Sequence, residues 1–131
     1  MAKGKRIKSL AEVVEEVQSP ESALADMHFN DGDYEEAAAA YQKILEEECT
    51  AHIHEKLANC YLKLGRHEEA EAEYKKAVEL KPESSYFHAC LADFYAEIGN
   101  VDEARAIFQK AAELCENKDE YIRERLAELG S

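Results

Sequence analysis

The sequence repeats itself with a period of 33 and then 34 residues. The recurring residues are Gly32, Gly65 and Gly99, then Ala37, Ala70 and Ala104, then Tyr41, Tyr74 and Phe108. A period of this length is typical of stacked helical hairpins, none of which buries its apolar face alone. The repeat therefore predicts an all-α solenoid, a class of fold that usually presents a surface for holding another molecule.

Composition agrees with an all-helical domain and limits its partners. The chain has only two Pro and five Gly in 131 residues, which leaves little room for strands or long loops. Its net charge is −13, although four of its 16 basic residues lie within residues 1–8. An acidic body gains no counterion-release affinity for nucleic acid and is repelled by anionic membranes. We expect a protein or peptide partner, amphipathic or basic in character, and neither nucleic acid nor membrane.

Capping residues and glycines place the expected helices. Ser9, Asp33, Asn100 and Asn117 are each followed three residues later by glutamate, which is the pattern of a capping box at a helix start. A glycine commonly ends a helix because it adopts the left-handed conformation readily. The expected segments are a basic flexible start at 1–8, an N-terminal capping helix at 9–18, three hairpins at 19–50, 51–84 and 85–116, and a C-terminal capping helix at 117–131.

The sequence also predicts a compartment. No stretch approaches ~18 consecutive apolar residues, the length that a membrane-spanning helix needs. The apolar residues after the basic start are interrupted by Glu12, Glu15 and Glu16, which argues against a signal peptide. The four cysteines have no C-x-x-C spacing and suit reduced, partly buried thiols. We therefore expect a cytoplasmic protein.

The recurring residues resemble the tetratricopeptide repeat. That repeat carries Leu-Ala and then an aromatic residue in its first helix, a glycine at the turn, and an alanine and an aromatic residue in its second helix. The matching residues are Leu24-Ala25, Leu57-Ala58 and Leu91-Ala92, then Tyr61 and Tyr95, with the closing proline at Pro82. The resemblance covers about residues 18 to 116. It implies a right-handed superhelical solenoid of three hairpins with a capping helix at each end.

The resemblance also implies a binding site, because the first helices of this family line a concave groove that accepts a peptide. The implied lining is Ser22, Asp26, Phe29, Asn30, His52, Glu55, Lys56, Asn59, Leu62, Lys63, Tyr86, Ala89, Cys90, Asp93, Ala96 and Glu97. Phe29 and Tyr86 are expected to anchor a peptide, and the carboxylates and amides are expected to set its polarity. In the alternative interpretation, the two anchors pack against the N-terminal helix or a second subunit.

One subfamily grips the C-terminal carboxylates of chaperones with a clamp of Lys, Asn, Asn, Lys and Arg. The matching positions here hold Ser22, Asp26, Lys56, Tyr86 and Cys90. Only one of the five residues is basic and one is acidic, so a carboxylate would be poorly paired. We therefore expect no carboxylate clamp.

Two narrower resemblances stay open as alternatives. The stretches around Tyr86–Cys90 and Asp119–Tyr121 resemble the end of the tetratricopeptide-type chaperones of type III secretion translocators, which implies a chaperone for a secreted client. The regular second hairpin also resembles an engineered consensus-like scaffold without a natural ligand. The exposed ends of a three-repeat stack would also allow a homodimer through the terminal helices.

Neither catalysis nor a metal or other cofactor is expected. His52 and His54 lie two residues apart, which places them on different faces of a helix. No cysteine pair has the short spacing of a zinc site. The sequence has no glycine-rich phosphate loop, nucleophile elbow or H-E-x-x-H motif. His54 and His88 occupy equivalent repeat positions and are expected at the edge of the core. Cys60 and Cys90 lie on neighbouring first helices, at a separation that the sequence leaves open.

Overall fold

The computed structural model describes residues 20–130 of the chain. Within that range it has seven α-helices and no strand, and none of these helices is long and apolar enough to cross a membrane. The helices are α2 (Pro20–Asn30), α3 (Tyr34–Glu47), α4 (Ala51–Lys63), α5 (His67–Leu80), α6 (Ser85–Glu97), α7 (Val101–Leu114) and α8 (Glu120–Gly130). The basic start expected at 1–8 and the capping helix expected at 9–18 lie outside the described residues.

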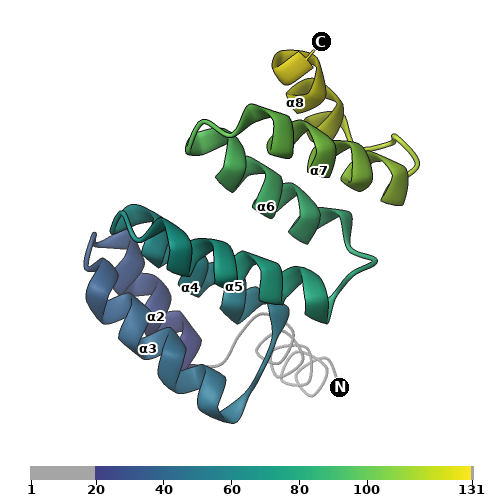
Figure 1. Cartoon of the computed structure of the whole chain (residues 1–131). Helices are drawn as coiled ribbons and strands as arrows, with labels where there is room; N and C mark the ends of the chain where they lie inside the picture. Colours follow the sequence, from purple (N-terminus) through teal and green to yellow (C-terminus); the bar gives the residue numbers. More distant parts are fainter. Residues whose placement is uncertain (1–19, 131) are drawn as a thin grey trace, which may run out of the picture.

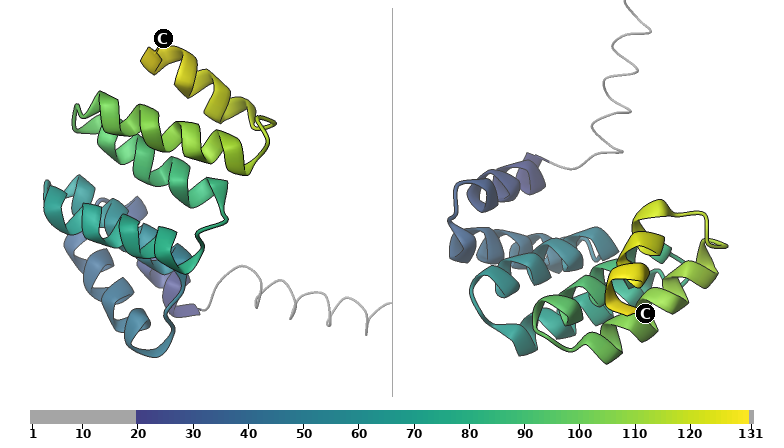
Figure 2. Two further views of the ribbon diagram at one scale, coloured as in Figure 1. Left: turned by 45° about the vertical axis from the view of Figure 1, so that its right-hand side comes forward. Right: turned by 90° about the horizontal axis from the view of Figure 1, so that it is seen from above.

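The helices form three hairpins stacked one after another (Figure 1). Helix α2 pairs with α3, α4 with α5, and α6 with α7. The second helix of one hairpin packs on the first helix of the next, and α8 packs on α7. Figure 2 shows α2 and α8 at opposite ends of the stack. The all-α solenoid predicted from the repeat is confirmed.

Each hairpin turns on a glycine in the left-handed region. Gly32, Gly65 and Gly99 have φ of 87°, 80° and 90°. The N–H of the following residue bonds back to the carbonyl five residues earlier, as Arg66 does to Tyr61 at 2.8 Å. Apart from each glycine and its two chain neighbours, no heavy atom lies within 4 Å of the place where a Cβ would stand. Glycine is therefore required for its backbone conformation and not for space.

Small residues bring the two helices of each hairpin close together. The alanines at the crossings are fully buried, namely Ala25, Ala58 and Ala92 on the first helices and Ala37, Ala70 and Ala104 on the second. The rings of Tyr41, Tyr74 and Phe108 fill the space beside them and are buried as well. Small and aromatic residues alternate, so that the rings fill the space that the alanines leave and the interior is close-packed. These repeated positions form the core, as the pattern predicts.

Three expectations from the pattern are wrong. Leu24, which matches the buried Leu57 and Leu91, is exposed. Asp33 makes no side-chain capping hydrogen bond at the start of α3. The cap of α8 is Asp119 and not the expected Asn117, because Asp119 Oδ1 accepts from the Ile122 N–H at 3.1 Å.

Asn117 does not cap α8 because it belongs to the turn that ends α7. Glu116 and Asn117 have φ of 57° and 59°, and the Asn117 N–H bonds to the Ala112 carbonyl at 2.8 Å. Two left-handed residues therefore close α7 before α8 begins. Asp119 caps α8 instead, because its side chain reaches the free N–H of Ile122 in the first turn.

Helix α8 has the register of a fourth first helix. Its cap, Asp119, corresponds to Thr50 at the start of α4 and Ser84 at the start of α6, since each side chain accepts an N–H from three residues later. Tyr121 of α8 therefore corresponds to Tyr86 of α6, two residues after the cap in each case. The C-terminal helix thus continues the line of first helices at the end of the stack.

Candidate functional site

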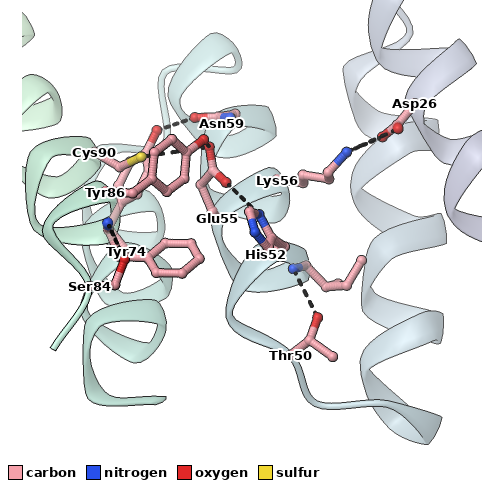
Figure 3. Close-up of polar contacts among 12 residues, drawn as sticks. Asp26, Thr50, His52, Glu55, Lys56, Asn59, Tyr74, Ser84, Tyr86 and Cys90 are labelled. Carbon is pink, nitrogen blue, oxygen red and sulfur yellow. Dashed lines mark hydrogen bonds and ion pairs between the residues drawn. The ribbon is translucent and has the colours of Figure 1, made fainter. Parts of the chain in front are cut away.

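The residues predicted to line a groove lie on the first helices, where side chains join one first helix to the next. We call this surface the first-helix face and define it by Asp26, His52, Glu55, Lys56, Asn59, Tyr86, Cys90, Asp93, Tyr121 and Arg125. Figure 3 shows its central part, with α4 between the other helices. The face is a row of three polar junctions, between α2 and α4, α4 and α6, and α6 and α8.

The predicted lining residues offer very different amounts of surface. The exposed members are Asn30, His52, Lys63, Tyr86 and Glu97. The half-buried members are Asp26, Phe29, Lys56, Asn59, Leu62, Cys90, Asp93 and Ala96. The buried members are Ser22, Glu55 and Ala89. The buried side chains support their neighbours and present little surface to a ligand.

Asp26 ties α2 to the rest of the face. The Lys56 ammonium on α4 lies 3.1 Å from Asp26 Oδ1 and 3.0 Å from Oδ2, which is a forked ion pair (Figure 3). The Tyr41 hydroxyl, from α3, also donates to this carboxylate. Asp26 is therefore balanced by a charge and a hydrogen bond from within the protein.

The centre of the face is built on the buried carboxylate of Glu55. The Tyr86 hydroxyl donates to Glu55 Oε2 at 2.8 Å, and the Cys90 thiol lies 3.7 Å from the same oxygen. His52 Nδ1 lies 3.6 Å from Glu55 Oε1 on the other side (Figure 3). One acidic residue of α4 thus holds two side chains of α6 in place.

The protonation of these two partners is fixed by their surroundings. Burial, followed by the nearby Glu55, raises the pKa of the Cys90 thiol to about 12. Burial, followed by Cys90 and Glu55, also raises the pKa of the Tyr86 hydroxyl. Both groups keep their protons at neutral pH, because loss of either would place a second negative charge beside Glu55. They therefore act as hydrogen-bond donors and not as nucleophiles.

Asp93 forms the third junction. It accepts from the Tyr121 hydroxyl at 2.6 Å and from Arg125 Nε at 3.1 Å, both on α8. The Arg125 guanidinium also lies over the Phe108 ring, 5.6 Å from its centre. The sequence did not reveal these α8 residues as members of the face. A register that starts α8 at its Asp119 cap would have found them, since Tyr121 then matches Tyr86.

The two expected anchors differ in their surroundings. The Tyr86 ring is 50% exposed and lies 5.1 Å from the Phe87 ring and 5.8 Å from His52. The Phe29 ring is half-buried and lies 5.1 Å from Tyr34, at the turn between α2 and α3. Tyr86 is thus an accessible ring held by a hydrogen bond and two ring neighbours, whereas Phe29 serves mainly to pack its own hairpin.

The histidines and cysteines differ in burial: His54 and Cys60 are buried, whereas His52 and Cys49 are exposed. His54 is buried, with Nδ1 2.6 Å from Glu73 and Nε2 3.5 Å from the Cys49 sulfur, as expected of a histidine at the edge of the core. All four cysteines are free thiols, including Cys60 and Cys90. Among residues 20–130, no three metal-binding side chains gather in a way that could hold an ion.

Comparison with known proteins identifies the family. Two models of the tetratricopeptide repeat match the chain, one over residues 16–83 and the other over residues 55–119. The chain belongs to the tetratricopeptide-repeat family, whose domains are non-catalytic protein-interaction modules. No curated protein matches its sequence.

Solved structures with the same fold include peptide-bound domains. The second such domain of human RPAP3, in complex with the HSP70 peptide SGPTIEEVD, is 24% identical, with 83% of this chain and 91% of that domain covered and a TM-score of 0.71. The Yersinia enterocolitica secretion chaperone SycD, in complex with a peptide of the translocator YopD, is 21% identical, with 83% and 88% covered and a TM-score of 0.72. A repeat protein of Thermus thermophilus is 28% identical, with 83% and 58% covered and a TM-score of 0.70.

Proposed function

We propose that the protein binds a peptide segment of a partner along the first-helix face and does no chemistry on it. The observation that carries this proposal is the Tyr86 ring, which is half-exposed yet fixed. Its hydroxyl donates a hydrogen bond to the buried Glu55, and its ring lies against His52 and Phe87. An aromatic side chain that is ordered before binding loses little entropy when a ligand covers it. Such residues carry much of the energy in protein interfaces.

The paired charges on the face bear on the chemistry of the ligand. Asp26 is matched by Lys56, Asp93 by Arg125, and Glu55 accepts from Tyr86. These three carboxylates therefore have less attraction for a basic peptide than their number suggests. The ligand that fits best is amphipathic, with an apolar or aromatic side chain against Tyr86 and His52.

An amide on the same face can bind the backbone of such a peptide. Asn59 uses its carbonyl oxygen to accept from the Tyr74 hydroxyl. Its NH₂ group has no acceptor among the described residues and is free to donate to a peptide carbonyl. The exposed Glu97 lies four residues beyond Asp93 on α6, and it supplies the attraction that remains for a single basic side chain.

The same pairing argues against a partner with an acidic C-terminal tail. Lys56 is the one basic residue among the five positions that match the carboxylate clamp, and Asp26 already occupies it. A carboxylate placed there would have to displace Asp26 or share Lys56 with it. We propose that peptides such as the HSP70 peptide bound by RPAP3 are not ligands of this protein.

A selection of displayed random peptides on the wild-type protein would test the proposal. The peptides recovered should be amphipathic, and replacing both contact residues, Tyr86→Ala with His52→Ala, should weaken them about tenfold or more. Leu80→Ala is the matched control, because it removes an exposed apolar side chain from α5 and should change affinity less than twofold. Peptides that bind the double variant as well as the wild type would place the binding surface elsewhere and refute the proposal.

Two other interpretations stay predictions beside this one. The likeness to SycD, at 21% identity, is a likeness of fold, so a role as a secretion chaperone rests on the sequence resemblance alone. An engineered scaffold without a natural ligand would give no enriched peptide in the selection. A secretion chaperone would give peptides that match a translocator of its own organism.

A further inference from the structure

Two apolar residues of α2 are exposed at places where the other repeats bury theirs. Leu24 is 54% exposed, whereas the equivalent Leu57 and Leu91 are 1% and 6% exposed. Met27 is 59% exposed, whereas the residues in its place, Cys60 and Phe94, are 0% and 2% exposed. The difference lies in what covers each helix and not in the residue types, because the repeat keeps an apolar residue or a thiol at both positions.

The later repeats show which element covers these two positions on a first helix. In the stack, α3 packs on α4 and α5 packs on α6, so a preceding second helix covers each of these first helices. Leu57 and Leu91 accordingly belong to the same continuous core as Tyr41 and Ile44 of α3. Among the described residues, no helix stands before α2 in this way.

A cavity lies at this uncovered end of the stack. Its volume is about 330 Å³, and it is lined by residues of α2 and α3. Three of the lining residues are apolar, namely Leu24, Ala40 and Ile44, and three are charged, namely Glu21, Lys43 and Glu47. A lining of both kinds suits an amphipathic helix that lays one face into the cavity.

The chain carries such a segment directly before α2. In residues 9–18 the apolar side chains Leu10, Val13, Val14 and Val17 follow a spacing of three and four, so a helix would bring them onto one face. Only two residues separate Val17 from Pro20, where α2 begins. The connections from α3 to α4 and from α5 to α6 are similarly short, at residues 48–50 and 81–84.

We infer that residues 9–18 form a helix that packs against α2 and α3 in the place of a preceding second helix. Its valines cover Leu24 and Met27 and fill the cavity over Ile44. The inference does not depend on the proposed function, since this end of the stack lies apart from Tyr86. It leaves the first-helix face as the open surface of the protein.

A second copy of the chain is the competing occupant, and two arguments favour the chain's own segment. A segment joined to α2 by the single residue Ser19 is present at an effective concentration that a separate molecule reaches only in concentrated solution. Each copy also carries a net charge of −13, so two copies repel one another at low salt.

Methyl NMR on the full chain tests the contact itself. At a concentration where sedimentation shows a monomer, we expect nuclear Overhauser effects from the methyl groups of Val13, Val14 or Val17 to those of Leu24 or Ile44. Mixing differently labelled molecules separates contacts within one chain from contacts between chains. Absence of these effects, or their appearance only between molecules, would overturn the inference, and the second result would assign the cavity to a second copy.

A pair of variants tests the energetic role of the segment. Val13→Lys with Val17→Lys places charges on the apolar face, and amide hydrogen exchange in α2 should become about tenfold faster while α6 and α7 stay protected. Glu15→Lys with Glu16→Lys adds the same side chains to the other face and should leave exchange in α2 unchanged. Equal exchange in α2 for the wild type and the valine pair would contradict the inference.

Discussion

The first two repeats and the third differ in which residues donate hydrogen bonds to one equivalent polar side chain of the first helix. Asp26 and Asn59 are equivalent, and each accepts from a tyrosine of its own hairpin, Tyr41 or Tyr74. In the third repeat the tyrosine is replaced by Phe108, which has no hydroxyl. Asp93 turns instead to Tyr121 and Arg125 of α8.

This difference shows that the repeats are not equally self-sufficient. In each of the first two, the polar side chain accepts a hydrogen bond from a tyrosine of the same hairpin, and Asp26 also pairs with Lys56 of the next hairpin. The third depends on the helix that follows it, because α8 supplies both the Tyr121 hydroxyl and the Arg125 charge to Asp93. Helix α8 is therefore part of the third repeat's structure and more than a cover for its apolar surface.

The largest expected effect concerns the packing of α8. Ile122 is buried in a cluster with Phe108, Ala111 and Ala112. We expect Ile122→Ala to lower the free energy of unfolding by about 3 kcal/mol, because it leaves a cavity in this cluster. Urea denaturation measures the loss, with Leu80→Ala as an exposed control expected below about 0.5 kcal/mol. A cost below about 1 kcal/mol for Ile122→Ala would mean that α8 is only loosely attached.

The next effect compares the two cations of the face. Arg125→Ala removes the bond to Asp93, the pair with Glu128 and the contact with the Phe108 ring, and should cost about 1.5 kcal/mol. Lys56→Ala should cost about 0.5 kcal/mol, because Asp26 keeps the Tyr41 hydroxyl. Denaturation of both variants in the same buffer decides the order. Equal costs would contradict the comparison between the repeats.

Restoring the hydroxyl to the third repeat sharpens the comparison. Phe108→Tyr should change stability by less than about 0.5 kcal/mol in the wild type, where Asp93 is already satisfied. In the Arg125→Ala background it should recover about 0.5 to 1 kcal/mol, because the new hydroxyl can bond to Asp93. A double-mutant cycle measures this coupling. Purely additive costs would show that the hydroxyl and Arg125 do not serve the same carboxylate.

The turns give a smaller effect. Glu116 stands at φ 57° in the turn before α8, where the hairpin turns have glycine. Glu116→Gly should raise the free energy of unfolding by up to about 1 kcal/mol, because glycine adopts this conformation without strain. Thermal unfolding measures the gain. Glu113→Gly, inside α7, is the matched control and should destabilise by a similar amount.

The smallest effect depends on pH. The Tyr95 hydroxyl on α6 donates to Glu71 on α5 and lowers the pKa of that carboxyl below its ordinary value of 4.5. The stabilisation is therefore present above about pH 4.5 and fades as the pH falls through the lowered value. Tyr95→Phe should reduce stability more at pH 7 than at pH 3. Tyr61, bonded to the neutral Gln42, is the control, and Tyr61→Phe should cost the same at both pH values.

Much of the fold could be predicted from sequence because its determinants are local. Gly32, Gly65 and Gly99 mark turns by their own backbone conformation, and the repeated alanines mark the helix crossings. Exposure of Leu24 could not be predicted in this way, because it depends on whether another helix stands before α2.

The site was harder to predict because its contacts lie far apart along the chain. The partners of Asp26 and Asp93 are 15 to 32 residues away, so no spacing of three or four reveals them. The sequence placed Asp26, Glu55 and Asp93 on the right helices but did not predict their hydrogen-bond and ion-pair partners. Which carboxylates are neutralised follows only from the way neighbouring first helices meet.

The order of packing along the stack also bears on how the protein opens and closes. Helices pack mainly with their neighbours in the stack, so losing a terminal helix leaves the middle intact. The protein should therefore fray from both ends, with the slowest exchange in α4 and α5. Contacts between near neighbours in sequence also favour rapid folding. A ligand that contacts both His52 of α4 and Tyr86 of α6 would then rest partly on the last part of the molecule to melt.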